Sequence, residues 1–399
     1  MALQRIKVLC FFLLSISPIS YGQDASVEDE TQSSSYTLIT EKLTSKVLLE
    51  ERTVVVQLPK SYAENPDKKY PIIYRLDGAT TLVMLNAVLE SLQSQRAAPE
   101  VIVVAIENTD RLRDLYPNVN KDPNGPVGYG GGGAKFLQFI TSELMPMVES
   151  KYRVHDFRVI AGASAAGAFS LYAMQQAPEL FNAALTYSAA VWWAHGATAK
   201  TTVEFIKNNK KLDHYLYTAI GNEGAPMRPY YDAMISDIRK NKPEGLRWHN
   251  DVFNDVPHNL VTNAASFKAY YSLFYSEYMR PKDYDGDLSS IEKYYEVVSQ
   301  QRGEKIEAAE WVIRELGYHF VSEQDFDEAI KLFQYGIERY PNAPDAYNGL
   351  AYGYEQSGQF EKALEQVNKA LALASSDYDG YDVYVGRRER LLNKLGESW

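Results

Sequence analysis

Ser164 lies in a segment whose small residues suit a nucleophile at a sharp turn. Residues 157–168 read FRVIAGASAAGA, a β-prone run followed by a tight small-residue turn and a helix start. A serine at the apex of such a strand-to-helix turn needs small residues two places before and two places after it. Gly162 meets this need, and Ala166 stands where a second glycine is usual. The pattern predicts a nucleophile elbow around Ser164, the alternative being a helix start without chemistry.

His258 is the histidine best placed to activate this serine. A serine hydroxyl is a weak nucleophile until a positioned base takes its proton. In folds with such a strand-to-helix elbow, that base lies in a loop after one of the last strands. His258 follows the β-prone run 247–253 and precedes an expected helix over residues 264–274. His195, beside two tryptophans, is the rival, and we expect it to line the pocket instead.

An acid must fix the histidine tautomer, and Glu223 is the first candidate. In folds with such an elbow, the acid follows a strand that lies between the serine and the histidine in the sequence. Glu223 comes directly after the β-prone run 214–221, which gives the order serine, glutamate, histidine. Asp251 and Asp255 are the alternative acids, and a helix-capping carboxylate is the alternative role for Glu223.

Acyl transfer also needs backbone N–H groups for the oxyanion. One donor is expected from Ala165, which follows the nucleophile at a helix N-terminus. The second is expected from the turn after an earlier strand, at Gly78 or Ala79. These residues together predict a carboxylic ester hydrolase that works through an acyl-serine intermediate.

The elements that would position these residues alternate between strands and helices. The expected strands are 53–58, 71–77, 100–106, 157–161, 183–187, 214–221 and 247–253. Several are almost continuously apolar, as in strands buried on both faces of a parallel sheet. The pattern predicts a three-layer α/β-hydrolase sandwich over residues 37–279.

The composition changes after residue 279. Residues 280–288, RPKDYDGDL, predict a linker, and the sequence beyond them predicts helices. Two segments of this region match at an offset of 34 residues, for example Leu316 with Leu350 and Ala329 with Ala363. The pattern resembles tetratricopeptide repeats at about 310–343 and 344–377, in an all-α domain over 289–399. Flanking or capping helices are expected at 289–301 and 381–395.

The beginning of the sequence predicts export. Arg5 and Lys7 precede an apolar run that is too short to span a membrane, which predicts a signal peptide over residues 1–22. The polar residues 23–36 predict a disordered leader. Cys10 is the only cysteine, so the exported chain would contain no disulfide or cysteine-ligated metal. We expect a periplasmic or extracellular protein without a membrane anchor.

The charge of the chain argues against nucleic-acid binding. The net charge is −11, and removing Arg5 and Lys7 would bring it to −13, that is −11 minus 2. No group of histidines and carboxylates has metal-ligand spacing, so neither a metal nor another cofactor is expected.

Residues 45 to about 275 resemble the putative esterase family that includes the enterochelin and bacillibactin esterases. The resemblance rests on residues 45–56, 76–78, 108–114 and 136–146, on the elbow, and on 191–193. It implies triad roles for Ser164, Glu223 and His258, and an oxyanion hole bordered by the Asp77-Gly78 turn. Ala163 departs from the histidine that is common in the family, which implies a changed pocket wall.

Several further residues are expected near the substrate. They are Asp77, Arg111, Arg113, Trp192 and Trp193. Residues 108–133 predict a mobile loop bordering the site, because their glycine-rich part lacks the lysine and hydroxyl of a phosphate loop. The tryptophans suit stacking on a substrate or plain packing equally well.

The expected substrate is a small-molecule or oligosaccharide ester. A siderophore trilactone and an acylated carbohydrate remain alternatives, and a protein partner is expected to bind the repeats. The contrasting hypothesis is a non-catalytic, hydrolase-like scaffold that recruits partners through those repeats.

Overall fold

The computed structural model describes residues 36–123 and 125–396. The expected signal peptide, residues 1–22, lies outside these residues, as does the expected leader up to residue 35. Tyr36, expected as the last residue of the leader, is instead the first residue of a strand.

Eight strands form one sheet in the order β1-β2-β4-β3-β5-β6-β7-β8. The expected strand runs all appear, with ends shifted by a few residues. β3, β4, β6 and β7 are buried along their whole length, whereas β8 has no buried residue. β1 was not expected, because its sequence YTLITEKLTS is mostly polar and it pairs only with β2. The strands are β1 Tyr36–Ser45, β2 Glu50–Pro59, β3 Tyr70–Arg75, β4 Ile102–Ile106, β5 Val154–Ala163, β6 Ala183–Tyr187, β7 Tyr215–Ile220 and β8 Arg247–Val252.

The direction of the strands decides where a site can form. β1, β2 and β4 pair antiparallel, whereas all pairings from β4 through β3 to β8 are parallel. The carboxyl ends of these six parallel strands therefore meet at one edge of the sheet, which we call the carboxyl edge. The opposite edge is the amino edge. In open α/β sheets the loops at the carboxyl edge form the ligand site.

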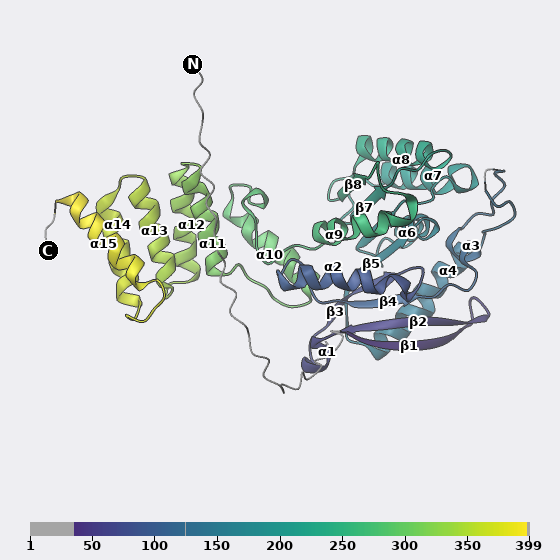
Figure 1. The fold of residues 1–399 in the computed structure, drawn as a ribbon, viewed down its shortest axis with the longest axis horizontal. Helices are drawn as coiled ribbons and strands as arrows, with labels where there is room; N and C mark the ends of the chain where they lie inside the picture. Colours follow the sequence, from purple (N-terminus) through teal and green to yellow (C-terminus); the bar gives the residue numbers. More distant parts are fainter. Residues whose placement is uncertain (1–35, 124, 397–399) are drawn as a thin grey trace, which may run out of the picture. The chain divides into compact units, whose positions relative to one another are not determined.

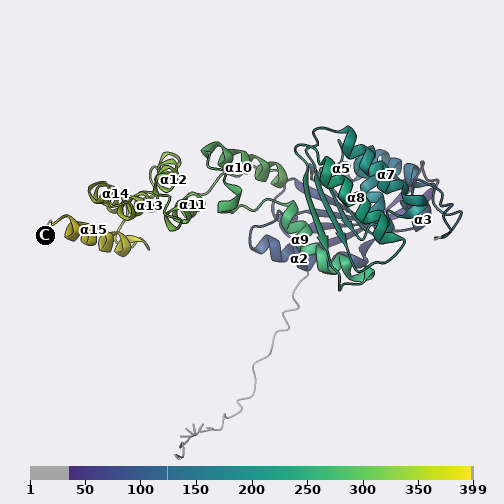
Figure 2. The same ribbon diagram turned by 90° about the horizontal axis from the view of Figure 1, so that it is seen from above.

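Helices cover both faces of the sheet, which makes three layers (Figure 1). α2 and α9 pack on one face, and α4 to α8 pack on the other, as Figure 2 also shows. α6 is buried along almost its whole length, which its nearly all-apolar sequence permits. The helices are α1 Ser61–Glu64, α2 Leu82–Ser94, α3 Arg111–Leu115, α4 Gly133–Phe139, α5 Met145–Lys151, α6 Ala165–Gln176, α7 Trp193–Asn208, α8 Met227–Asn241 and α9 Val261–Leu273.

The rest of the described chain is helical. α11–α12 and α13–α14 form the two helix pairs expected from the repeats, with α10 before them and α15 after them. Gly317 shows why small residues recur at the crossings, since a Cβ there would lie 2.5 Å from the Phe333 ring. These helices are α10 Leu288–Arg302, α11 Glu310–Ser322, α12 Phe326–Arg339, α13 Pro344–Gln356, α14 Phe360–Leu373 and α15 Tyr381–Leu395.

Residues 280–288 differ from the expected polar linker. Tyr284 is 7% exposed and belongs to the apolar cluster of α10 and α11, and its hydroxyl group bonds to Glu328. The C-terminal end of α10 is also fixed, because Gln301 Nε2 donates to Leu273 O at 3.1 Å and Arg302 Nη2 to Arg96 O at 2.9 Å. The segment is a packed connection, because the side chain of Tyr284 is buried against α10 and α11. The polar residues around Tyr284 in the sequence give no sign of this burial.

Candidate active site

Ser164 stands between β5 and α6 in a strained backbone conformation. Its φ and ψ are 56° and −118°, values that a non-glycine residue adopts only when its surroundings enforce them. The enforcing bonds run from Ser164 N to Tyr187 O at 2.9 Å and from Ala190 N to Ser164 O at 2.9 Å. The serine is thereby held at the carboxyl edge of the sheet, at the start of a buried helix.

The small residues around Ser164 have a steric reason. A Cβ on Gly162 would lie 2.5 Å from the carbonyl carbon of Ala166, so only glycine fits at 162. With glycine there, the methyl group of Ala166 is accommodated, although a second glycine is the usual residue. The departure from the usual elbow pattern therefore leaves the turn intact.

His258 and Glu223 meet beside this turn. His258 Nδ1 lies 3.0 Å from Glu223 Oε1, and the two side chains are 42% and 7% exposed, respectively. With Nδ1 turned to a carboxylate, the imidazole presents Nε2 as the nitrogen free to exchange a proton. Glu223 follows β7, and His258 opens the short 3₁₀ turn His258–Leu260 beyond β8. Both positions are those expected from the sequence.

The two alternative acids lie elsewhere. Asp251 accepts a hydrogen bond from Tyr217 Oη at 2.7 Å and pairs with Lys268. Asp255 is exposed. Of the three candidate carboxylates, only Glu223 contacts the His258 ring.

A cavity of about 450 Å³ brings the three side chains together. Among the described residues no hydrogen bond joins Ser164 to His258; in substrate-free sites such bonds are often long and tighten only when substrate binds. The lining residues are Arg111, Leu112, Tyr116, Pro126, Ser164, Ala165, Ala190, Trp192, Trp193, Glu223, Gly224, Ala225, Pro226, Met227 and His258.

Of the expected oxyanion donors, Ala165 has an N–H group without an acceptor in its helix, whereas Gly78 and Ala79 do not have a free N–H group. Ala165 is the first residue of α6, so its N–H group has no acceptor within the helix, and the residue lines the cavity. The expectation for Gly78 and Ala79 is wrong. Gly78 N donates to Ile106 O at 2.9 Å, and Ala79 N donates to Glu107 Oε1 at 2.9 Å. Because both N–H groups are occupied within the protein, neither is free for an oxyanion.

Arg111 lines the cavity, whereas its partner Asp77 lies behind it. Arg111 Nε and Nη2 donate to the two oxygens of Asp77 at 2.6 and 2.9 Å. These bonds raise the pKa of Arg111, so the side chain stays positively charged. Asp77 therefore positions Arg111. The expectation that Asp77 itself lines the pocket is wrong.

Arg113 was expected in the pocket and is not there. Its Nη2 lies 2.7 Å from Glu50 Oε1 and its Nε 2.7 Å from Asp114 Oδ1. Arg111 and Arg113 are two residues apart on α3, so their side chains leave the helix in different directions. The sequence shows two similar arginines, but only Arg111 reaches the cavity.

The two tryptophans divide the roles expected for them. Trp193 is 3% exposed, stacks on Tyr116 at 3.9 Å between ring centroids, and donates from Nε1 to Asn118 O at 3.0 Å. Trp192 is half-buried at the cavity wall, where Gly125 presses against its ring. Both tryptophans line the cavity, but Trp193 is in addition fixed by its stacking on Tyr116 and its hydrogen bond to Asn118 O.

The glycine-rich loop is fastened, whereas a mobile loop had been expected. Asn120 Nδ2 donates to Asp122 O and Pro126 O at 3.0 and 3.2 Å, and Gly128 N donates to Asn120 O at 2.9 Å. Buried Asp122 also lies 3.2 Å from His195 Nδ1. His195 thus anchors to this loop and does not line the cavity, contrary to expectation.

Two family models match the chain, one in its first part and one in its second part. Residues 45–235 match the model of the putative esterase family, and residues 320–379 match that of the tetratricopeptide repeat. The first part of the chain is thus similar to the putative esterase family, and the second part is similar to tetratricopeptide repeats. The mixed sheet with helices on both faces is the α/β-hydrolase fold expected from the sequence.

Curated relatives match this chain over part of their own lengths. The YbbA protein of Bacillus subtilis is 27% identical over 150 residues, which cover 37% of this chain and 60% of YbbA. The siderophore triacetylfusarinine C esterase of Aspergillus fumigatus is 28% identical over 153 residues, 36% of this chain and 52% of the enzyme. The chain thus spans less than two thirds of the length of either relative.

Solved structures share the fold. An IroE-like serine hydrolase from Shewanella oneidensis superimposes with a TM-score of 0.60 and 23% identity, covering 74% of this chain and 98% of that one. A protein from Capnocytophaga ochracea superimposes with a TM-score of 0.63 and 18% identity, covering 90% of this chain and 100% of that one.

Within residues 36–123 and 125–396, no helix has the length and apolarity needed to cross a membrane. In the same part of the chain, no three histidine, cysteine, aspartate or glutamate side chains gather as a metal site requires.

Proposed function

We propose that the esterase domain hydrolyses carboxylic esters through an acyl-serine intermediate. The observation that carries the proposal is the strained Ser164 in one cavity with His258, whose Nδ1 is 3.0 Å from the buried carboxylate of Glu223. A nucleophile, a base and an orienting acid at the carboxyl edge of an α/β sheet suit acyl transfer.

The proposed reaction has two halves. In the first, Ser164 Oγ attacks the ester carbonyl carbon while His258 Nε2 takes the hydroxyl proton, and the same nitrogen then returns the proton to the leaving alcohol. In the second, water attacks the acyl-serine with His258 again as base, which releases the acid and restores Ser164. Glu223 holds the ring orientation and stabilises the imidazolium in both halves.

The oxyanion of each tetrahedral intermediate needs donors near Ser164. We assign the first to the N–H group of Ala165, where the N-terminus of α6 adds its dipole. We assign the second to Arg111, because the turn at Gly78 and Ala79 has no free N–H group. Arg111 donates through Nε and Nη2 to Asp77 and through Nη2 to Ala163 O, and it stays charged, so Nη1 remains for a substrate oxygen.

The substrate class is a small-molecule or oligosaccharide ester. The cavity joins an aromatic wall at Trp192 with the cation of Arg111, which suits an acyl group with a ring or a polar substituent. The Aspergillus relative is a siderophore esterase by name, which favours trilactone siderophores over acylated sugars. Turnover of ferric enterobactin-type trilactones against acetylated and feruloylated sugars decides between them.

We also propose that the chain acts after export, in the periplasm or outside the cell, and that the repeats bind a protein partner. The basic pair and short apolar run at residues 5–19 support export. Fractionation of cells producing the full chain tests it, since the mature protein is expected outside the cytoplasm, and a cytoplasmic location with uncleaved residues 1–22 contradicts it.

Ser164→Ala tests the mechanism. Hydrolysis of short p-nitrophenyl esters is expected to fall by about 10³-fold or more, because no other group can form the acyl intermediate. The wild type is expected to react with a fluorophosphonate probe and the variant is not. The variant should melt within a few degrees of the wild type, which separates lost chemistry from lost folding. Undiminished turnover, or a wild type inert to the probe, contradicts the proposal and favours a non-catalytic scaffold.

A further inference from the structure

A second cavity lies at the amino edge of the sheet and holds an excess of positive charge. Its volume is about 330 Å³, and β8, α9, residues 274–283 and α10 contribute its walls. Its cationic lining residues are Arg247, Lys268, Arg280 and Lys282. The remaining lining residues are His249, Tyr271, Ser272, Phe274, Tyr275, Ser276, Asp283 and Tyr294.

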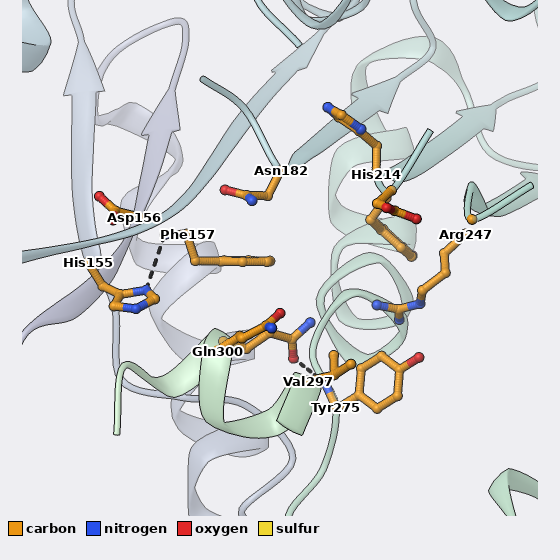
Figure 3. Close-up of a pocket in the computed structure, with 13 residues that line it drawn as sticks. His155, Asp156, Phe157, Asn182, His214, Arg247, Tyr275, Val297 and Gln300 are labelled. Atoms are coloured by element: carbon orange, nitrogen blue, oxygen red, sulfur yellow. Dashed lines mark hydrogen bonds between the residues drawn. The ribbon is translucent and has the colours of Figure 1, made fainter. Parts of the chain in front are cut away.

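Arg247 is the unusual member of this set, because its guanidinium has no carboxylate partner among the described residues. Its Nη2 donates to Ser272 O at 2.6 Å, and both Nη atoms lie 3.2 Å from Leu273 O. The guanidinium lies 4.3 Å from the centroid of the Tyr275 ring, beside which Figure 3 shows it. Burial lowers the pKa of Arg247, yet an arginine keeps its charge in proteins. A half-buried cation without a counter-ion is costly, so an anion beside it would be stabilised.

The other cations leave the charge of the cavity unbalanced. Lys268 pairs with Asp251, and Arg280 pairs with Asp283 at 2.8 Å. Lys282 is exposed and has no ion-pair partner in the described part of the chain. Four cations against these two carboxylates leave two positive charges, in a chain whose net charge is −11.

The adjoining cavity lacks this excess. It has a volume of about 510 Å³ and shares Arg247 and Tyr275 with the cavity of about 330 Å³, but its lining also includes the carboxylates of Asp213 and of Asp156, which Figure 3 labels. Like charges raise the cost of bringing an anion there. The positive field is therefore concentrated on the α9 side of Arg247.

We propose that the cavity between β8, α9 and residues 274–283 binds a dianionic tetrahedral oxyanion: free sulfate or phosphate, or a phosphate monoester group on a small molecule. Arg247 lines it, and the N–H groups that its carbonyl bonds leave unused, on Nε and Nη1, would donate to the ligand oxygens. Lys268, Arg280 and Lys282 supply the surrounding charge. A dianion matches the two unbalanced charges, whereas chloride or a single carboxylate leaves one. The site is at the sheet edge opposite to Ser164, so it is independent of the proposed esterase reaction.

Calorimetric titration of the full chain with sodium sulfate, in sodium chloride at matched ionic strength, tests the site. Saturable one-to-one binding is expected, with a rise in Tm that chloride does not reproduce. Lys282→Glu is expected to weaken binding at least tenfold, because the exposed substitution reverses a charge of the site without removing a packed group. Lys207→Glu on α7, another exposed lysine, is the matched control and should bind as the wild type does. Equal binding by wild type and Lys282→Glu, or no binding beyond chloride, overturns the proposal.

His249 provides a local readout of the same site. Its pKa is lowered by burial and by Arg247, Lys268 and Lys282, against the opposing influence of Asp251. A dianion among these cations should raise the pKa of His249 in an NMR titration. An unshifted His249 pKa under saturating sulfate contradicts binding at this place.

Two ligand sources are separated by a further titration. N-acetylglucosamine 6-phosphate, with N-acetylglucosamine as control, tests a dianionic phosphate group carried by a sugar. Tighter binding of the sugar phosphate than of free phosphate assigns the site to a group on a larger ligand, and equal or weaker binding assigns it to the free ion. Failure of both the sugar phosphate and the free ions to bind overturns the proposal.

Discussion

Two arginines at opposite edges of the sheet, buried Arg52 and half-buried Arg247, differ in the partners of their guanidinium groups. At the carboxyl edge, Arg52 is 1% exposed and its Nη1 pairs with Glu50 at 2.8 Å and Asp114 at 2.6 Å. At the amino edge, Arg247 meets only carbonyl oxygens and aromatic rings. The arginine at the carboxyl edge is thus neutralised by carboxylates, whereas the unbalanced charge at the other edge suits an anion.

Glu223→Gln is the sharpest test of pairing at the carboxyl edge. The variant cannot stabilise the imidazolium or fix the tautomer of His258, so kcat should fall by about 10³- to 10⁴-fold. Steady-state kinetics with p-nitrophenyl esters measure this fall. Asp255→Asn removes an exposed carboxylate of the same region and should leave kcat near that of the wild type. The reverse outcome, a large loss in Asp255→Asn alone, would move the acid role to Asp255.

The neighbouring tryptophans separate packing from substrate contact. Trp193→Ala removes a buried ring stacked on Tyr116 and should cost about 3 to 5 kcal/mol in the free energy of unfolding. Trp192→Ala should cost much less and instead change KM between esters with and without an aromatic acyl group. Chemical denaturation and a small ester panel measure both quantities. If Trp192→Ala proves the more destabilising variant, the assigned roles are exchanged.

Replacing each buried arginine by methionine compares the two edges directly. Arg52→Met leaves Asp114, which is 1% exposed, with one cation fewer, and should cost about 3 kcal/mol of stability. Arg247→Met removes a cation that has no carboxylate partner, so its cost should be about 1 kcal/mol or less. Urea denaturation in sodium chloride without sulfate or phosphate gives both values. Equal losses would show that the carbonyl and ring contacts of Arg247 compensate its charge fully.

The sequence was a good guide wherever one segment decides the outcome. The apolar runs predicted β3, β4, β6 and β7 because burial on both faces leaves a continuous signal, and the 34-residue offset predicted the helix pairs. The elbow also depends on residues close in sequence, since Gly162 and Ala166 belong to one turn. β1 escaped prediction because an edge strand with polar alternation carries little apolar signal.

Prediction failed where a contact joins distant segments. Glu107 reaches across from the end of β4 to the N–H group of Ala79, and nothing near residue 79 indicates this bond. Tyr284 similarly finds its core in helices that follow it, so residues 280–288 looked like a linker. The triad roles of Ser164, Glu223 and His258 stay predictions, for which the geometry provides support and the variants above provide the test.

Arg111 and Arg113 give the last and smallest contrast, between two similar residues on one short helix. Arg111→Gln should lower kcat/KM by on the order of 10²-fold, because it removes a charged donor proposed for the oxyanion. Arg113→Gln should lower Tm through its lost bonds to Glu50 and Asp114 and leave kcat/KM close to that of the wild type. Kinetics and thermal melts of both variants measure the contrast. If Arg111→Gln changes KM with kcat intact, Arg111 binds the substrate in its ground state and the second oxyanion donor lies elsewhere.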